Sequence, residues 1–233
     1  MSSRRFLKPE LDFASDHTLL VRFSDEISPE YHANVHKLTR LLLEEEKEGI
    51  LNVHPAYASV LVTFDPMKIL PEQIQQFVRK LIGEMESVVL PDPRFVEIPV
   101  CYGDESGPDL ADVAAHNDLK IDEVIRIHSS AEYLVYFLGF APGFPYLGGM
   151  SERIAAPRLS TPRTVVPAGS VGIAGRQTGV YSASSPGGWR IIGRTPMRLF
   201  HRDRDPLTLL QMGDRVKFLP ITKKEFEEIT KRP

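Results

Sequence analysis

The pattern of apolar and polar residues divides the chain into two parts. In the first ninety residues, short β-prone runs alternate with runs in which apolar residues recur every three or four positions. These runs predict strands at 18–23, 50–54, 58–64 and 88–90, with one helix after Ser28 and another near Pro71. The order β-α-β-β-α-β is that of a ferredoxin-like domain.

Both predicted helices are amphipathic. Ser28 and Pro29 supply an N-cap and a first-turn proline, and the polar run that follows the first helix points to Gly49 as its C-cap. Apolar stripes complete the pattern, formed by Tyr31, Val35, Leu38 and Leu42 and then by Ile74, Phe77, Val78, Leu81 and Ile82.

The pattern changes after the stiff segment Pro91-Asp92-Pro93. Strands are expected at 95–101 and 132–138, with two short helices, 108–116 and 121–128, between them. From Gly139 to Pro196, eleven of the sixteen glycines separate short β-prone runs at 164–166, 171–174, 180–182 and 189–192. That spacing is typical of an all-β barrel or sandwich. A last helix is predicted over 222–231, capped by Thr222. We therefore predict an α+β protein with domains at 1–92 and 93–233.

Residues 139–150 read G-F-A-P-G-F-P-Y-L-G-G-M. Four glycines and two prolines exclude a regular helix and make a poor strand, so the stretch is either a structural elbow or a backbone surface shaped for a ligand. Its aromatic residues, Phe140, Phe144 and Tyr146, are expected to pack inside the protein.

Composition excludes several classes of function. The 233 residues carry a net charge of −3, which gives no electrostatic reason to expect nucleic acid or an anionic membrane surface. No apolar run is long enough for a membrane span, and the start M-S-S-R-R-F-L-K-P-E has no signal-like apolar segment. The single cysteine, Cys101, allows no intrachain disulfide. We expect a cytoplasmic protein.

Familiar catalytic and metal-binding motifs are missing from the sequence. It contains no P-loop, no H-E-x-x-H and no G-x-S-x-G. His32 and His36 are spaced for one face of a helix, but no third ligand accompanies them, so we interpret them as a polar helix face and expect no metal site.

Arginines are the chief candidates for chemistry. Six of them fall in the glycine-rich segment, namely Arg158, Arg163, Arg176, Arg190, Arg194 and Arg198. A guanidinium group suits carboxylate or phosphate, so several converging arginines form an anion site; alternatively each one is solvated or paired with an acid. His128 either contacts the dipole of its helix or acts as a general acid or base. Trp189 is expected in the core.

Five motifs in order make the chain resemble a known family. They are P-V-C-Y-G-x-x-x-G-P-D-L (99–110), E-V-I-x-x-H (123–128), L-G-F-A-P-G-F-P-Y-L-G-G (138–149), P-R-x-x-x-P-R-x-x-V-P-A-G-S-V-G-I-A-G-x-Q-T-G-V-Y (157–181) and S-P-G-G-W-x-x-I-G-R-T-P (185–196). Together they resemble the KipI/PxpB family, also described as allophanate hydrolase subunit 1 or carboxyltransferase subdomain C/D. Asp104 and Ser106 depart from the family's pattern in a turn.

The resemblance implies a ferredoxin-like N-terminal domain and a cyclophilin-like β-barrel domain. It also implies the B subunit of an ATP-dependent 5-oxoprolinase, a hydrolase that uses ATP as co-substrate. Such an enzyme needs two partners, a related cyclophilin-like C subunit and a third one, the A subunit. Two alternatives stay open: an inhibitor of a sporulation-type sensor histidine kinase, and a carboxyltransferase half that acts on biotin.

The resemblance also nominates site residues. The matching positions include Arg158, Arg163, Gln177, Arg194, His128 and the loop glycines Gly139, Gly143 and Gly148; we predict that His128 is catalytic and that the others bind substrate.

Overall fold

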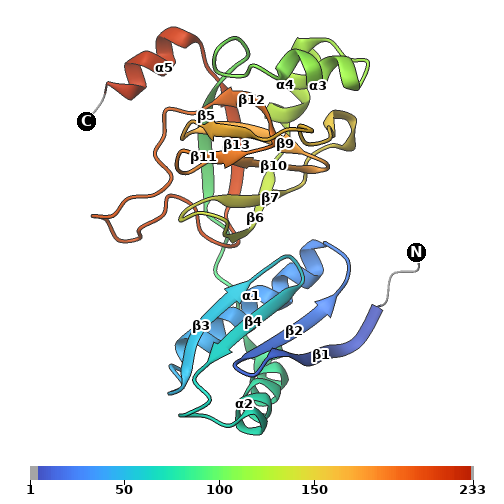
Figure 1. Ribbon diagram of the computed structural model, residues 1–233, viewed down its shortest axis with the longest axis vertical. Coiled ribbons are helices and arrows are strands. Elements are labelled where there is room, and N and C mark those ends of the chain that lie inside the picture. The colour runs from blue at the N-terminus through green and yellow to red at the C-terminus, as the bar shows by residue number, and fades with distance from the viewer. Residues whose placement is uncertain (1–4, 232–233) are drawn as a thin grey trace. The chain divides into compact units, whose positions relative to one another are not determined.

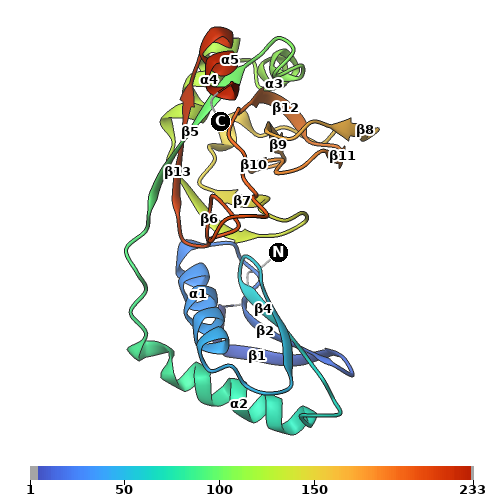
Figure 2. The ribbon, with the colours of Figure 1, turned by 90° about the vertical axis from the view of Figure 1, so that its left-hand side faces the viewer.

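The computed structural model describes residues 5–231, which divide into two compact units, Met1–Asp92 and Pro93–Pro233. Figures 1 and 2 show a helix-backed sheet in the first unit and a barrel in the second. No helix in the described range is long and apolar enough to cross a membrane.

The first unit is a four-stranded antiparallel sheet with two helices. Its elements are β1 (Arg5–Ser15), β2 (Thr18–Ser24), α1 (Pro29–Glu44), β3 (Ile50–Pro55), β4 (Ser59–Phe64), α2 (Pro71–Glu84) and a short 3₁₀ turn, Met85–Ser87. The strand order is β1-β2-β4-β3. Alternate residues of β2 and β4 are buried, as expected for a sheet with one covered face. The apolar stripes of both helices complete this core.

The predicted β-α-β-β-α-β order is wrong at both ends. Residues 88–90 form no strand; Pro91 and Pro93 follow them and lack the N–H groups that a sheet ladder needs. The fourth strand is instead β1, which turns tightly and pairs antiparallel with β2. The order is therefore β-β-α-β-β-α, and the ferredoxin-like assignment of this unit is not confirmed.

Both helix starts in this unit were predicted correctly, but the end of α1 was not. Ser28 caps α1 by accepting a hydrogen bond from the Tyr31 amide, and Pro29 opens the helix. However, α1 ends at Glu44 instead of running to Gly49, which lies directly before β3 with a φ of +91°. His32 is buried, so the expectation of a polar face fails at that position.

The second unit contains a closed barrel of seven strands, which confirms the predicted barrel and the α+β class. Around the barrel the order is β10-β7-β6-β13-β5-β12-β9, and every neighbouring pair is antiparallel except β13 with β5. The strands are β5 (Phe95–Tyr102), β6 (Tyr133–Leu138), β7 (Pro145–Gly148), β9 (Ser170–Ala174), β10 (Gln177–Val180), β12 (Arg190–Arg194) and β13 (Arg215–Pro220).

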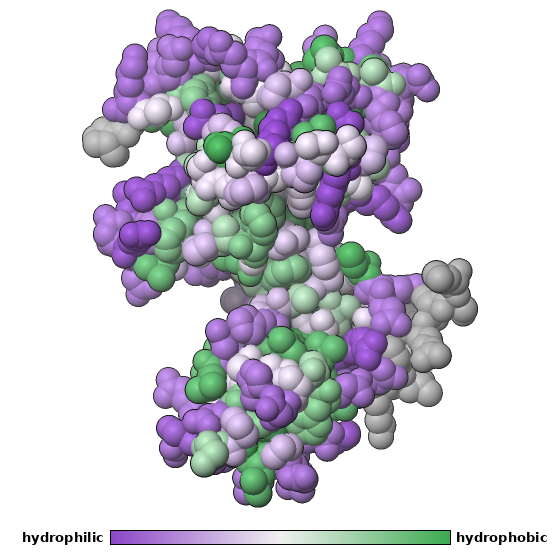
Figure 3. All heavy atoms as spheres, viewed as in Figure 1, coloured by the Kyte–Doolittle hydropathy of each residue, from purple (hydrophilic) through white to green (hydrophobic). Residues whose placement is uncertain are grey.

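Helices and a two-stranded ribbon surround the barrel. The ribbon pairs β8 (Arg163–Val166) with β11 (Ser185–Gly187). The helices are α3 (Leu110–His116), α4 (Ile121–Ser130), a 3₁₀ turn at Glu152–Ile154, and α5 (Lys223–Thr230). Thr222 caps α5 as predicted. Figure 3 shows hydrophilic side chains over α5, which buries no residue.

Two barrel strands were not predicted. Residues 145–148 form β7, although they belong to the stretch judged a poor strand. Pro145 is tolerated because it is the first residue of the strand. At Gly148 a Cβ would lie 1.9 Å from Cε2 of Tyr136, so the close packing of β7 requires glycine. The other strand that was not predicted is β13. Its buried residues, Val216 and Phe218, alternate with less buried ones, as is typical of a strand.

Candidate functional site

His128 lies in the interior of the second unit. Its side chain is fully buried near the end of α4, and its ring stacks on Phe218 with centroids 4.6 Å apart. Nδ1 lies 2.7 Å from the Tyr102 hydroxyl and Nε2 lies 2.9 Å from Oγ1 of Thr178. The Tyr133 hydroxyl donates to the backbone carbonyl of His128.

Hydrogen bonding fixes the state of this ring. Thr178 donates its one hydroxyl proton to the carbonyl of Gly172 at 3.0 Å, so it accepts from Nε2–H of His128. Nδ1 then accepts from the Tyr102 hydroxyl. Burial lowers the pKa of His128 to about 3, which keeps the ring neutral at physiological pH. The ring does not reach any pocket described below, so its proton-transfer role stays a prediction.

Two of the predicted arginines lie beside Tyr181, in what we call the Tyr181 cluster: Tyr181, Arg158, Arg163, Phe140, Phe144 and Trp189. Burial raises the pKa of Tyr181, while a hydrogen bond from the Trp189 backbone and the charges of Arg158 and Arg163 oppose that rise. Arg158 is exposed and makes no ion pair with any described residue.

Arg163 is held in place by a buried carboxylate. Its Nη2 donates to Oδ1 of Asp109 at 2.7 Å, and Oδ2 of Asp109 accepts from the Ile191 amide at 2.6 Å. Nη1 of Arg163 is buried and has no hydrogen-bond partner among the described residues. Arg163 is therefore a positioned cation with one unused donor group.

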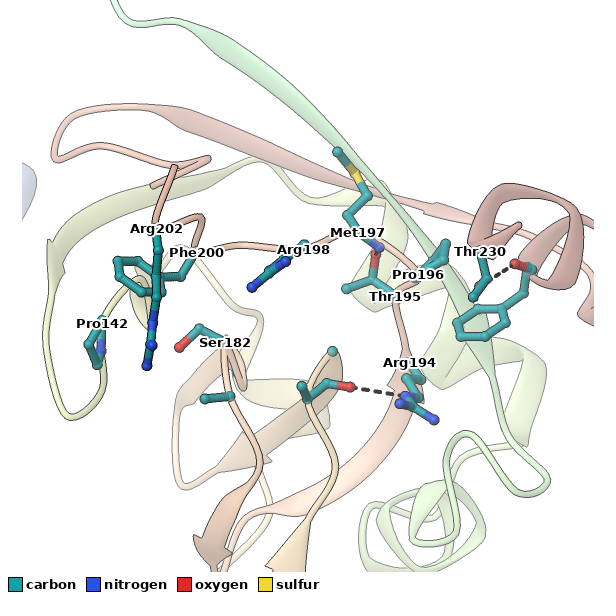
Figure 4. Close-up of a pocket in the computed structure, with 14 residues that line it drawn as sticks. Pro142, Ser182, Arg194, Thr195, Pro196, Met197, Arg198, Phe200, Arg202 and Thr230 are labelled. Atoms are coloured by element: carbon teal, nitrogen blue, oxygen red, sulfur yellow. Dashed lines mark hydrogen bonds between the residues drawn. The ribbon is translucent and has the colours of Figure 1, made fainter. Parts of the chain in front are cut away.

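A separate pocket collects a second set of arginines. It has a volume of about 770 Å³, and its lining includes Pro142, Ser182, Arg194, Arg198, Phe200 and Arg202. We call it the arginine pocket. Figure 4 shows Arg194 on one side of it, with Nε donating to the carbonyl of Ala168 at 3.0 Å, and Arg198 and Arg202 on the opposite side with Ser182. None of the fourteen lining residues is acidic.

The remaining arginines of the glycine-rich segment are paired with acids. Arg176 pairs with Glu152, and Arg190 pairs with Asp112 at 2.8 Å. Of the six arginines that the sequence singled out, only Arg194 and Arg198 line the arginine pocket. Arg202 also lines it and was not predicted, because it lies in a charged stretch, R-D-R-D, that has no spacing signal.

The loop at 139–144 borders both groups of residues. Pro142 lines the arginine pocket, and the Phe140 ring meets the Tyr181 ring edge-on at 6.4 Å. Gly143 has a φ of +79°, and a Cβ there would lie 3.0 Å from the carbonyl oxygen of Leu199, so the loop needs glycine at this position. Phe144 is buried as predicted, but Phe140 is 65% exposed, so the expected packing is wrong for that ring.

The other predicted positions serve the barrel. Gln177 begins β10 and pairs with Ala174 of β9. The Gly139 amide donates to the Phe144 carbonyl and closes the loop. Trp189 is buried, as predicted. Among the described residues, no group of three or more histidine, cysteine, aspartate or glutamate side chains could hold a metal ion.

Comparisons place this architecture in a known family. Residues 9–210 match the family described as carboxyltransferase domain, subdomain C and D. The chain is 46% identical over 227 residues to the 5-oxoprolinase B subunit of Bacillus subtilis (strain 168), a match that covers 93% of this chain and 95% of that protein. It is 55% identical over 137 residues to the 5-oxoprolinase B subunit of Escherichia coli O157:H7, covering 59% of this chain and 63% of that protein.

Solved structures give the same picture. A conserved uncharacterized protein from Pyrococcus horikoshii is 48% identical, with a TM-score of 0.56 over 93% of this chain and 100% of that one. Urea carboxylase of Kluyveromyces lactis has a TM-score of 0.78 over 94% of this chain and 22% of that one; at 22% identity it shows the fold alone.

The chain thus belongs to the carboxyltransferase subdomain C and D family. Three curated relatives, which are 46% to 56% identical to this chain, are named as the B subunit of 5-oxoprolinase.

Proposed function

We propose that this chain is the B subunit of an ATP-dependent 5-oxoprolinase, which hydrolyses 5-oxoproline to L-glutamate. The observation that carries the proposal is the 46% identity to a 5-oxoprolinase B subunit over nearly the full length of both proteins. The family resemblance adds a cyclophilin-like type for the barrel and two partners, the C and A subunits, and the composition adds a cytoplasmic location. The chain alone is expected to be inactive.

The reaction has clear chemical requirements. The lactam of 5-oxoproline is an unactivated amide, and transfer of a phosphoryl group from ATP to its oxygen creates a good leaving group. A site for this chemistry must hold one carboxylate, the phosphoryl group and the negative charge that develops between them. Guanidinium groups and backbone N–H groups stabilise all three.

In this proposal, Arg158, Arg163 and Arg194 orient the anionic groups of the reactants. Among the described residues, Nη1 of Arg163 has no hydrogen-bond partner and Arg158 makes no ion pair, and both observations support an anion beside Tyr181. Arg194 and Pro142 contribute to the arginine pocket, so the 139–144 loop borders both places. Gly143 and Gly139 give this loop its path, whereas Gly148 and Gln177 act through the barrel strands.

In this proposal, His128 transfers a proton only indirectly, by way of a group to which it is hydrogen-bonded. Its two ring nitrogens are occupied by Tyr102 and Thr178. A role in positioning β10 against α4 accounts for these contacts without any contact to a reactant.

The test is an ATP-dependent 5-oxoproline assay of the complex assembled from this chain and its partner subunits, with glutamate and phosphate both measured. Arg158→Ala and Arg194→Ala should each lower kcat/KM by about 10-fold to 100-fold, the cost of losing a charge-assisted hydrogen bond. Arg176→Ala is the control, because Arg176 is exposed and pairs with the exposed Glu152. Normal rates for both Arg158→Ala and Arg194→Ala would falsify the assignment of these residues.

The family resemblance implies two alternative functions. One is inhibition of a sensor histidine kinase, and the other is carboxyl transfer involving biotin. An assembled complex that fails to hydrolyse 5-oxoproline, combined with inhibition of kinase autophosphorylation or with carboxyl transfer to biotin, would favour these functions instead.

A further inference from the structure

We infer that the arginine pocket binds a polyphosphate group, as carried by a nucleoside triphosphate, and that Arg198 and Arg202 are its phosphate-binding residues. This inference deepens the proposed function, on which it rests for the choice of ATP as the nucleotide. The charge, size and lining of the pocket in this chain alone support it.

Uncompensated positive charge is the first argument. Arg194, Arg198 and Arg202 all line the pocket, and none of them pairs with a carboxylate of a described residue. Four other arginines of the same unit, Arg94, Arg163, Arg176 and Arg190, are paired with acids, whereas Arg158 and Arg204 make no ion pair with a described residue. Three guanidinium groups around a pocket without an acidic lining residue suit a ligand with several negative charges more than a monocarboxylate.

The second argument is the size and shape of the site. Its volume of about 770 Å³ is typical of pockets that hold nucleotide-sized molecules and is far larger than a phosphate ion needs. Phe200, Met197 and Phe226 also line the pocket, so it offers apolar and aromatic surface beside the charges. A ligand with a charged end and a planar apolar end matches this combination.

The third argument is how the two arginines are presented. They lie on the connection between β12 and β13, which folds back on itself: the His201 amide donates to the Leu207 carbonyl at 2.7 Å, and the Leu209 amide donates to the Leu199 carbonyl at 2.9 Å. In this hairpin-like arm, residues 199–209, Arg202 directly follows the outer of these two hydrogen bonds, and Arg198 directly precedes the arm. In Figure 4 both side chains extend to the side of the pocket where Ser182 lies.

Ser182 supplies an independent observation. Its hydroxyl is buried and has no hydrogen-bond partner among the described residues, although the residue lines the pocket. Buried hydroxyl groups rarely lack a partner. We assign its missing partner to a phosphate oxygen bound in the pocket, which is a strong acceptor for a hydroxyl group.

The inference is tested by calorimetric binding to the full chain without its partners. The probes are ATP, tripolyphosphate, inorganic phosphate and 5-oxoproline. The variants are Arg198→Ala, Arg202→Ala and, as control, Arg204→Ala, which removes the same charge from the same arm outside the pocket lining. All three positions are exposed, and circular dichroism verifies that each variant is folded.

We expect ATP and tripolyphosphate to bind the unmodified chain and Arg204→Ala equally well, and Arg198→Ala and Arg202→Ala to weaken binding by about 10-fold or more each. Tighter binding of ATP than of tripolyphosphate supports contact between the base and the apolar wall. Three results overturn the inference: no binding of either polyphosphate, an equal loss in Arg204→Ala, or inorganic phosphate or 5-oxoproline binding as tightly as ATP. Failure of the 5-oxoproline assay would leave this binding result unchanged, so the two proposals fail separately.

Discussion

At the scale of single residues, His128 is held on all sides by its surroundings. It is neutral, fully buried and hydrogen-bonded at both nitrogens, so folding requires that it give up any proton it carries in the unfolded chain. The ordinary pKa of histidine is about 6.5, and burial lowers that of His128 to about 3. Between these values the unfolded chain binds more protons than the folded one, so stability falls as the pH falls.

His128→Gln should therefore change the pH dependence of stability. Above pH 6.5 the variant should be less stable than the unmodified chain by about 1–3 kcal/mol, because glutamine cannot reproduce the geometry of both hydrogen bonds of the ring. Between pH 6.5 and pH 5 that deficit should shrink by about 2 kcal/mol, because glutamine does not titrate. Urea unfolding followed by fluorescence measures this, since Trp189 is the only tryptophan and lies in the same unit.

The matched control is His116→Gln, at an exposed histidine of α3. Its stability should follow that of the unmodified chain over the same pH range. A deficit of His128→Gln that stays constant from pH 7.5 to pH 5 would show that burial does not hold this ring neutral. Full activity of that variant in the assembled enzyme would exclude a proton-transfer role for His128.

At the scale of elements, adjacent glycines of the S-P-G-G-W motif have different tasks. At Gly187, at the end of β11, a Cβ would lie 2.3 Å from the Tyr181 hydroxyl oxygen and 2.9 Å from Cε1 of that ring. At Gly188, the nearest atom to such a Cβ lies 3.6 Å away, on Pro162, which is ordinary contact. The ribbon strand thus packs directly on Tyr181 through a position without a side chain.

Gly187→Ala should displace β11 from Tyr181 and destabilise the protein by about 1–3 kcal/mol, as overpacked positions do. Gly188→Ala should have little effect. Differential scanning calorimetry of the two variants makes the comparison, since they differ only in which neighbouring glycine is filled. Equal melting temperatures would mean that the ribbon moves freely against Tyr181.

Elements with strong local signals were the predictable part of the fold. Ser28 and Thr222 cap their helices, and α3 and α4 lie within two residues of the predicted ranges 108–116 and 121–128. Strand β7 was missed because proline and glycine normally oppose strands; here Gly148 is set by the distant ring of Tyr136. Strand β1 was missed because pairing with β2, and not its own composition, makes it a strand.

The candidate site was predictable only where motifs carried it. Arg158, Arg163 and Arg194 are in those motifs. However, their spacing could not show that Asp109 accepts a hydrogen bond from one terminal nitrogen of Arg163, or that Arg194 lines a separate pocket. Arg202 was missed because its closeness to Pro142 and Ser182 arises from the folding of an arm whose sequence resembles any solvated charged turn.

At the scale of the whole molecule, each unit has a hydrophobic core of its own. The core of the second unit contains buried residues of the barrel, α3 and α4, such as Ile98, Val124 and Tyr133. Such a core is the requirement for independent folding. A fragment of residues 93–233 should therefore fold without residues 1–92.

This fragment should show the near-ultraviolet circular dichroism of a packed aromatic core and a cooperative thermal transition. The full chain provides the reference for both signals. A fragment with a flat near-ultraviolet spectrum would show that residues 1–92 are needed to fold the barrel.

The place of β13 in the barrel has a consequence for how the chain folds during synthesis. This strand lies between β5 and β6 and pairs in parallel with β5, with Arg215 opposite Phe95. Both of its neighbours leave the ribosome long before it does, so β5 and β6 each keep an unpaired edge until β13 is made. Closure of the barrel is therefore a late and non-local event. Exposed strand edges invite association with other chains. The last strand to be made thus decides how long a nascent molecule stays open to aggregation.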